Sequence, residues 1–153
     1  MMLLLFGAVE IARVFYVYHS LQKAVRGGAA MLVRSSNVDY CSSSTDLTLQ
    51  DARNFIVYGN LQGQGQPVVQ GLTPDLIQIL PERIESGTTS VVACACNDDP
   101  NDAANCNTTV GARPPDFVVI NFGSGYPLQI PFAFVSLSSV NLRVSVRMPV
   151  TGG

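Results

Sequence analysis

The sequence predicts an α+β fold in which a long N-terminal hydrophobic helix packs on an antiparallel β-sheet. Three observations predict this fold. Residues 1–18 are almost entirely apolar, a helical spacing of apolar residues continues to about residue 34, and the later part of the 153-residue chain consists of short strand-like segments separated by turns. Thirteen glycines and nine prolines supply those turns. Because loops and not helices join the successive strands, we expect an antiparallel sheet.

The N-terminal apolar run contains only two charged residues, Glu10 and Arg13. It is about long enough to cross the hydrocarbon core of a bilayer. A removed secretory signal is the alternative, but no basic residue precedes the run and no small-residue cleavage site is obvious before Ala29. We therefore predict one helix from about Met1 to about Arg34, apolar all round in its first half and amphipathic in its second.

Residues 35–153 are expected to form a disulfide-stabilised globular domain after the helical region 1–34. A capping box at Thr48 and Asp51 predicts a short helix that ends at Gly59. The clearest strand is the last one, in which apolar and polar residues alternate so that Val144 and Val146 should face inward. The predicted strands are residues 76–80, which Pro81 should end, 88–96, 117–122 and 140–147.

The four cysteines are an even number in a small, turn-rich domain, which is typical of disulfides formed in an oxidising compartment. Reduced thiols and a zinc site are the alternatives, although no Cys-x-x-Cys or paired His supports zinc. Cys94 and Cys96 lie two apart on a predicted strand, so they point the same way and bond poorly to each other. We expect two disulfides, either Cys96–Cys106 with Cys41–Cys94 or the swapped pairing Cys94–Cys106 with Cys41–Cys96.

Charge and motifs argue against nucleic-acid binding and catalysis. Nine basic residues face eleven acidic ones, and no basic patch is dense enough to predict a nucleic-acid partner. We expect no enzyme and no cofactor, because the one His has no triad around it and no phosphate loop or dinucleotide fingerprint occurs. An oxygen-rich loop offers weak calcium candidates, but its spacing is not that of an EF-hand and a solvated turn is the preferred interpretation. These candidates are Asp98, Asp99 and Asp102, with Asn101 and Asn105 beside them.

The first thirty residues carry a recognisable pattern. An apolar run leads to Gly7, Glu10 follows three residues later, Arg13 follows three after that, and an aromatic run and an Ala/Gly-rich amphipathic continuation come next. This pattern resembles the TadE-like family, pilin-like proteins of the tight-adherence (Flp) pilus systems of bacteria, which are similar to type IV pilins. Later segments that resemble longer members of the family are residues 52–59, 71–74, 126–132 and 147–149.

The resemblance implies a pilin-like fold and a protein that resides first in a membrane and then in a filament. It implies processing by a prepilin peptidase, insertion into the bacterial inner membrane and then assembly into an extracellular filament or its machinery. The expected partners are other copies of the chain in a helical homopolymer, the inner-membrane pilus assembly machinery and the peptidase. Family members usually carry further residues that hold the cleaved Gly, so the cleavage site is not assigned. Lys23 and Arg26 would place this flank in the cytoplasm by the positive-inside rule, whereas the cysteines favour the outside.

The charges inside the apolar helix need partners, because a bare carboxylate in hydrocarbon costs several kcal/mol. One interpretation pairs Glu10 with Arg13, three residues later on the same helix face. The other pairs Glu10 with a group on a neighbouring subunit, where it would set the register of a helical stack. Gly7 and Ala8 allow helices to approach closely. Gly7, Glu10 and Arg13 are therefore the candidate assembly residues.

Three functions follow. The preferred one is a structural, adhesive subunit that polymerises through residues 1–34, which would serve as membrane anchor and filament core. A minor pilin or accessory of the pilus or secretion machine is the second. A single-span surface receptor is the third, and it would need a flexible linker, for which residues 37–45 are a short candidate.

Overall fold

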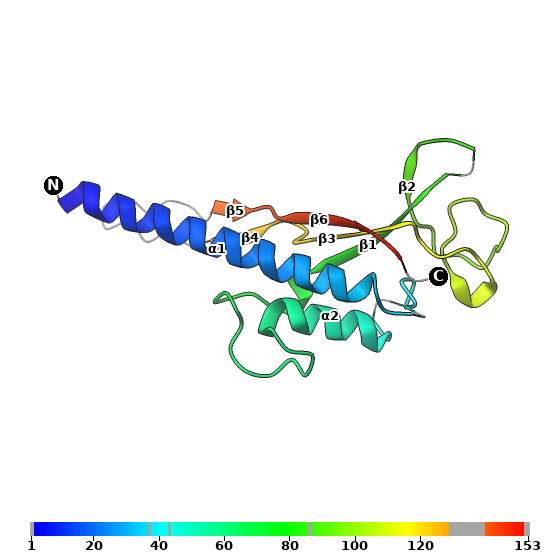
Figure 1. Cartoon of the computed structure of the whole chain (residues 1–153), viewed down its shortest axis with the longest axis horizontal. Helices are drawn as coiled ribbons and strands as arrows, with labels where there is room; N and C mark the ends of the chain where they lie inside the picture. Colours follow the sequence, from blue (N-terminus) through cyan, green and yellow to red (C-terminus); the bar gives the residue numbers. More distant parts are fainter. Residues whose placement is uncertain (1, 37, 43, 86, 129–139, 152–153) are drawn as a thin grey trace.

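The computed structural model describes residues 2–36, 38–42, 44–85, 87–128 and 140–151. Figure 1 shows a long N-terminal helix whose first turns extend beyond the rest of the molecule, with a sheet and a second helix gathered along its later turns. The helices are α1 (Met2–Leu32) and α2 (Leu47–Tyr58), with short 3-10 turns η1 (Pro74–Leu76) and η2 (Thr108–Val110). The strands are β1 (Gln78–Ile84), β2 (Val91–Ala93), β3 (Phe117–Asn121), β4 (Tyr126–Leu128), β5 (Val140–Leu142) and β6 (Ser145–Pro149).

The main sheet has four strands in the order β2-β1-β3-β6, and each neighbouring pair is antiparallel. β4 and β5 form a separate two-stranded antiparallel ribbon. α1 packs on β3, β6 and α2, so the helix covers one face of the sheet (Figure 1). The predicted α+β fold, with a long apolar helix on an antiparallel sheet and two disulfides, is confirmed.

The buried face of α1 appears only in its later part. Val17, Leu21, Val25, Ala29 and Leu32 recur every three or four residues and are all buried. A Cβ on Gly28 would come within 2.4 Å of the Ile56 side chain, so a glycine here is what lets α1 and α2 approach closely.

The second helix ends as predicted, but its N-cap lies two residues before the predicted one. Its N-cap is Asp46, whose Oδ1 accepts a hydrogen bond from the Leu49 backbone N–H at 3.0 Å. The capping box predicted at Thr48 and Asp51 is therefore wrong, because the Asp46 carboxylate caps the helix by binding the N–H of Leu49, its third residue. Gly59 adopts a left-handed conformation at φ 72° and ends the helix.

Pro81 does not end its strand, contrary to the prediction. β1 runs from Gln78 through Pro81 to Ile84. The Glu82 carbonyl and the Ile84 N–H point toward β3, since they bond Asp116, whereas the Pro81 carbonyl accepts from Cys94 on the other side. The missing N–H of Pro81 therefore faces away from β3, and the β1–β3 ladder loses no hydrogen bond.

The predicted strand over residues 140–147 is divided between two sheets. β5 pairs with β4, and β6 pairs with β3. The turn after β3, closed by a hydrogen bond from the Gly125 N–H to the Phe122 carbonyl, leads the chain into β4 and so provides β5 with a different partner. The predicted inward orientation is confirmed for Val144, which is buried. Val146 is half-buried and packs against the same core.

The disulfides follow the second of the two expected pairings. Cys41 bonds Cys96 and Cys94 bonds Cys106. The first bond ties the segment between the two helices to the loop after β2, and the second closes the loop that follows it. Chain-entropy arguments assign a stabilisation of ~4 kcal/mol to a loop as long as the first and ~3 kcal/mol to the second.

Candidate functional site

The first half of α1 exposes a continuous apolar surface. Seven large apolar side chains between Leu4 and Tyr16 are between 58% and 80% exposed, whereas Val14 is partly buried against the core and Leu21 and Leu32 are fully buried. We name residues 4–16 the exposed segment of α1; its members Leu4, Leu5, Phe6, Val9, Ile11, Phe15 and Tyr16 are the large exposed ones. Burying these seven side chains would contribute on the order of 10 kcal/mol. Val17, placed by the sequence within the assembly surface, is 8% exposed and belongs to the chain's own core.

Gly7 lies on this exposed segment with nothing near it. A Cβ added at Gly7 would meet no atom within 4 Å, whereas one at Gly27 would lie 2.8 Å from Phe55. The two glycine sites have the same sequence character, but only the later one is already used for close packing within the chain. The face around Gly7 remains open to a second helix.

Glu10 and Arg13 form a loose ion pair. Arg13 Nη1 lies 3.9 Å from Glu10 Oε2, beyond the about 2.7–3.2 Å of an N–H···O hydrogen bond. Within the described part of the chain, Oε2 of Glu10 is buried and has no hydrogen-bond partner. The intrahelical pairing expected from the sequence is therefore present as a charge contact, and the hydrogen-bonding capacity of this oxygen is unused within the described residues.

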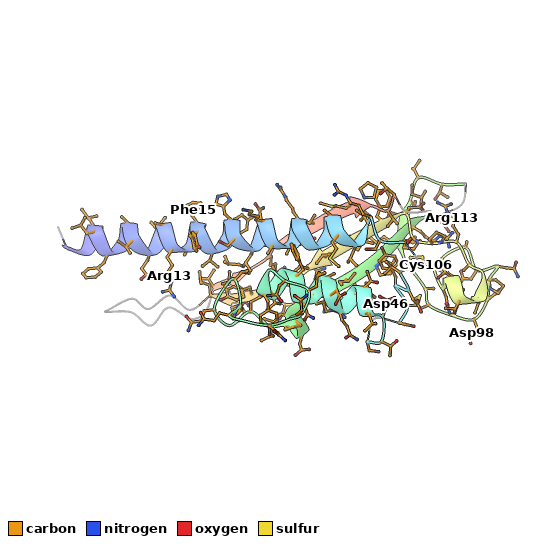
Figure 2. All side chains as sticks on the ribbon, turned by 60° about the horizontal axis from the view of Figure 1, so that its bottom comes forward. Arg13, Phe15, Asp46, Asp98, Cys106 and Arg113 are labelled. Carbon is orange, nitrogen blue, oxygen red and sulfur yellow. A yellow bond between two sulfur atoms is a disulfide. The ribbon has the colours of Figure 1, made fainter. Side chains whose placement is uncertain are left out.

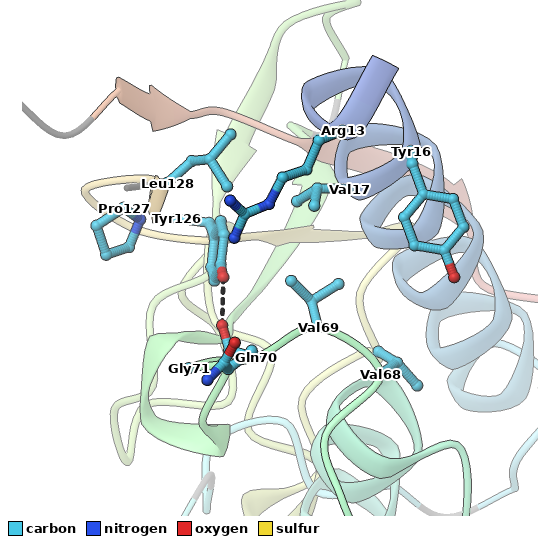
Figure 3. A pocket seen from close by; sticks show the side chains of 10 residues that line it. All are labelled: Arg13, Tyr16, Val17, Val68, Val69, Gln70, Gly71, Tyr126, Pro127 and Leu128. Atoms are coloured by element: carbon cyan, nitrogen blue, oxygen red, sulfur yellow. Dashed lines mark hydrogen bonds between the residues drawn. The ribbon is translucent and has the colours of Figure 1, made fainter. Parts of the chain in front are cut away.

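Arg13 also faces a cleft beside α1, which we name the α1 cleft. Its volume is about 650 Å³, and it is lined by Arg13, Tyr16 and Val17 of α1, by residues 68–71 and by residues 126–128. Figure 3 shows the guanidinium extending from the helix toward the Tyr126 ring. Burial raises the pKa of the Tyr126 hydroxyl, while the positive charge of Arg13 acts in the opposite direction. That hydroxyl donates a hydrogen bond to the Gln70 carbonyl oxygen (Figure 3).

The sequence did not reveal this cleft. Tyr126 and Gln70 lie 56 residues apart, and neither belongs to a motif. The only signal in the sequence was that Tyr126 begins one of the later segments, residues 126–132, that resemble longer members of the family. Arg13 was identified, but as a partner of Glu10 and not as a group facing a cleft.

The oxygen-rich loop lies at the opposite end of the molecule, as the labels for Asp98 and Cys106 show in Figure 2. It is organised by Asn105, whose side chain is fully buried. Asn105 Nδ2 donates to the carbonyls of Asn97 at 3.0 Å and Asp99 at 2.6 Å, and its Oδ1 accepts from the Asn107 N–H at 2.9 Å. This amide therefore supplies the loop with the internal bonds that hold its shape.

Two of the three calcium candidates, Asp99 and Asp102, accept hydrogen bonds within the same loop. Asp99 Oδ1 accepts the Asn101 N–H at 2.9 Å. Asp102 Oδ1 accepts the Ala104 N–H at 2.9 Å, and this bond, followed by one from the Asn97 amide, lowers the pKa of Asp102. Among the described residues no three His, Cys, Asp or Glu side chains are grouped so as to hold a metal ion.

The buried guanidinium of Arg83 joins this loop to the sheet. Arg83 lies on β1, is 5% exposed and donates from Nη1 to the Asn105 carbonyl. Together with Cys94–Cys106, this bond holds the loop against the end of the sheet. The loop is thus a stabilised end of the globular domain, remote from the exposed segment of α1 (Figure 2).

Comparison with known proteins gives one match, and it falls on α1. Residues 1–30 match the family model of TadE-like proteins. This match confirms the resemblance in the segment that carries Gly7, Glu10 and Arg13. No curated protein and no solved structure gives a match. The match and a helix long and apolar enough to cross a membrane are consistent with a membrane-anchored or surface component of a pilus system.

Proposed function

We propose that the chain is a structural subunit that assembles through the first half of α1 into an extracellular, type IV/Flp-like filament for adhesion. One observation supports this most directly: the exposed segment of α1 presents seven large apolar side chains to the surroundings, while the apolar stripe of the later part of the same helix is buried in its own domain. A surface of this kind has no stable state in water as a monomer. It is satisfied by lipid before assembly and by the helices of other copies afterwards.

Polar contacts and close packing give the assembly its direction. Transfer of the exposed segment from lipid to a bundle of helices changes hydrophobic energy little, because both surroundings are apolar. Gly7 permits close approach. Oε2 of Glu10 lacks a hydrogen-bond partner among the described residues, so turning this side chain outward to accept a donor from the next copy gives up no hydrogen bond at that oxygen. A head-to-tail contact of this type does not close, so it propagates as a helix and not as a ring. The globular domains then coat the outside, where oxidising conditions maintain both disulfides.

The remaining partners and the location follow from the same proposal. The chain resides in the bacterial inner membrane, a prepilin peptidase processes it, and pilus assembly machinery transfers it into the filament on the cell surface. We propose a structural and not a catalytic role. A minor pilin that caps or primes the same machine uses the same anchor, and the share of filament mass contributed by this chain distinguishes that role.

The test changes Glu10 while leaving the hydrophobic surface intact. Glu10→Gln and Glu10→Ala are expressed in the native host, and membrane-bound chain and surface filament are quantified separately. We expect the anchored subunit at normal amounts and at least a roughly tenfold loss of filament, since a buried charged hydrogen bond contributes about 1.5–3 kcal/mol. The matched control is Glu82→Gln, because Glu82 pairs with Arg147 on the globular domain. Normal filaments from both Glu10 variants would contradict the assembly role of this carboxylate.

A further inference from the structure

The α1 cleft contains a cation with unused donors. Arg13 has five N–H groups, and none donates a hydrogen bond within the described chain, since its contact with Glu10 is 3.9 Å. The guanidinium points into the cleft beside the Tyr126 ring (Figure 3). The exposed amide of Gln70, on the opposite wall, adds two more N–H donors. A ligand with an anionic, oxygen-rich group would satisfy these donors.

The walls around this cation are apolar. Val17 and Val69 are buried side chains at the inner wall, and Leu128 and Pro127 form part of another wall. The cleft volume, about 650 Å³, falls within the roughly 300–1,000 Å³ of sites that hold small organic ligands. A single cation next to apolar walls is complementary to an amphiphile with an anionic headgroup and an apolar tail.

The cleft lies where the exposed segment of α1 ends. Tyr16, which lines it, is 71% exposed, and the next residue, Val17, is the first one buried by the globular domain. If the exposed segment is in a bilayer, the level of Tyr16 is the headgroup region, where Tyr side chains are enriched. Arg side chains near a helix end also reach toward this region.

We propose that the α1 cleft binds the headgroup phosphate of a phospholipid while the chain is anchored in the membrane. Arg13 donates to the phosphate oxygens, and the apolar walls contact the glycerol and the first part of an acyl chain. This inference rests on the membrane-anchored state of the proposed function and adds a specific lipid contact to it. Since Arg13 then interacts with lipid before assembly, release of the lipid precedes any contact of Arg13 with a neighbouring copy.

The test measures retained lipid on the full chain. The protein is reconstituted in nanodiscs of mixed phosphatidylglycerol and phosphatidylcholine, extracted gently in detergent and weighed by native mass spectrometry. We expect one retained phospholipid, reduced roughly tenfold by Arg13→Gln, which removes a charge-assisted bond. Val68→Trp should reduce it similarly by filling the cleft from an exposed position without a change of charge. The matched control, Arg26→Gln, alters an exposed arginine of α1 outside the cleft and should retain the lipid.

Two further arms identify the occupant. Excess inorganic phosphate during extraction should leave the lipid bound; displacement of the lipid by phosphate would show that the cleft binds a free anion and would overturn the lipid assignment. Loss of filament in Val68→Trp with lipid retention unchanged would make the cleft an interface between copies, which also overturns it. Equal lipid retention in the unaltered chain and in all three variants would also overturn the lipid assignment.

Flotation with vesicles separates this inference from the proposed function. If the unaltered chain fails to float, both the anchor and the lipid site are wrong. If it floats and forms filaments but retains no lipid through Arg13, the lipid site alone is wrong.

Discussion

The two halves of α1 are continuous, apolar and helical, yet they have opposite environments. From Val17 onward an apolar stripe is buried against α2 and the sheet, and Lys23 and Arg26 lie on the exposed side. From Leu4 to Tyr16 no residue is fully buried: Gly7, Glu10 and Val14 are partly covered, and large apolar side chains lie exposed on the rest of the helix surface. The difference shows that patterning, and not hydrophobicity alone, determines whether a helix packs within its own chain. An all-round apolar helix must find its partners elsewhere.

The largest expected effect is the difference between replacing a leucine in the second half of α1 and replacing one in the first half. Leu21→Ala should lower the free energy of unfolding of the globular domain by about 3 kcal/mol, because Leu21 is fully buried and its loss leaves a cavity. Leu5→Ala should leave that free energy unchanged, since Leu5 is 68% exposed. Urea unfolding in detergent, followed by near-UV circular dichroism with the disulfides intact, measures both. A comparable loss from Leu5→Ala would show that the first half is part of the domain's own core.

Gly28 and Gly7 allow the same comparison between the two halves of α1, with smaller expected effects. Gly28→Ala should destabilise the domain by about 1–3 kcal/mol, because its Cβ would lie 2.4 Å from the buried Ile56 side chain. Gly7→Ala should stabilise the helix slightly, by about 0.5–1 kcal/mol, since nothing lies near its Cβ. Filament yield should respond in the opposite sense, falling for Gly7→Ala because neighbouring helices can no longer approach as closely. Unfolding midpoints and filament mass, measured on the same preparations, test the two expectations together.

Tyr40 confines a pH response to the globular domain, and replacing it should have only a small effect at neutral pH. Burial, and then the negative charge of Asp46, raises the pKa of Tyr40 to about 12 from an ordinary value of 10.0. The folded state therefore binds this proton more tightly than the unfolded state, so stability is full below pH about 10 and falls by roughly 2 kcal/mol as the pH rises to about 12.

Tyr40→Phe should remove this part of the alkaline loss. It should also stabilise the domain by up to about 1 kcal/mol at neutral pH, because the Tyr40 hydroxyl is buried and has no hydrogen-bond partner among the described residues. Unfolding at several values of pH between neutrality and about 11 measures the difference between the two proteins. An unchanged alkaline slope would assign the loss to other groups.

The fold was largely predictable because its signals are local. The helical spacing of α1, the Gly59 cap and the alternation around Val144 each depend on residues near one another in sequence. The N-cap at Asp46 rests on a local bond to the Leu49 N–H, so two acceptable caps, Asp46 and Thr48, lay close together in the sequence and the wrong one was chosen. The continuation of β1 through Pro81 was decided by hydrogen bonds to distant residues, which no local pattern contains. The division of the last strand had the same origin, since its partner changes from β4 to β3.

The candidate site was predictable in part. Gly7, Glu10 and Arg13 were identified because charges and a glycine are conspicuous in an apolar run. Their environments were not, since the open space at Gly7 and the unpartnered oxygen of Glu10 are properties of the folded chain. The α1 cleft required three segments to meet, so only the structure could reveal it.

Site-specific photo-crosslinking tests the central claim most directly. A photoreactive phenylalanine analogue is placed at Phe6, on the exposed segment of α1, or at Leu61, an exposed apolar position on the globular domain. Cells displaying filaments are irradiated, and crosslinked peptides are identified by mass spectrometry. The account predicts that Phe6 crosslinks mainly to residues 2–16 of another copy, while Leu61 does not. Crosslinks from Phe6 to lipid or to unrelated proteins alone, in surface filaments that contain the chain, would contradict it.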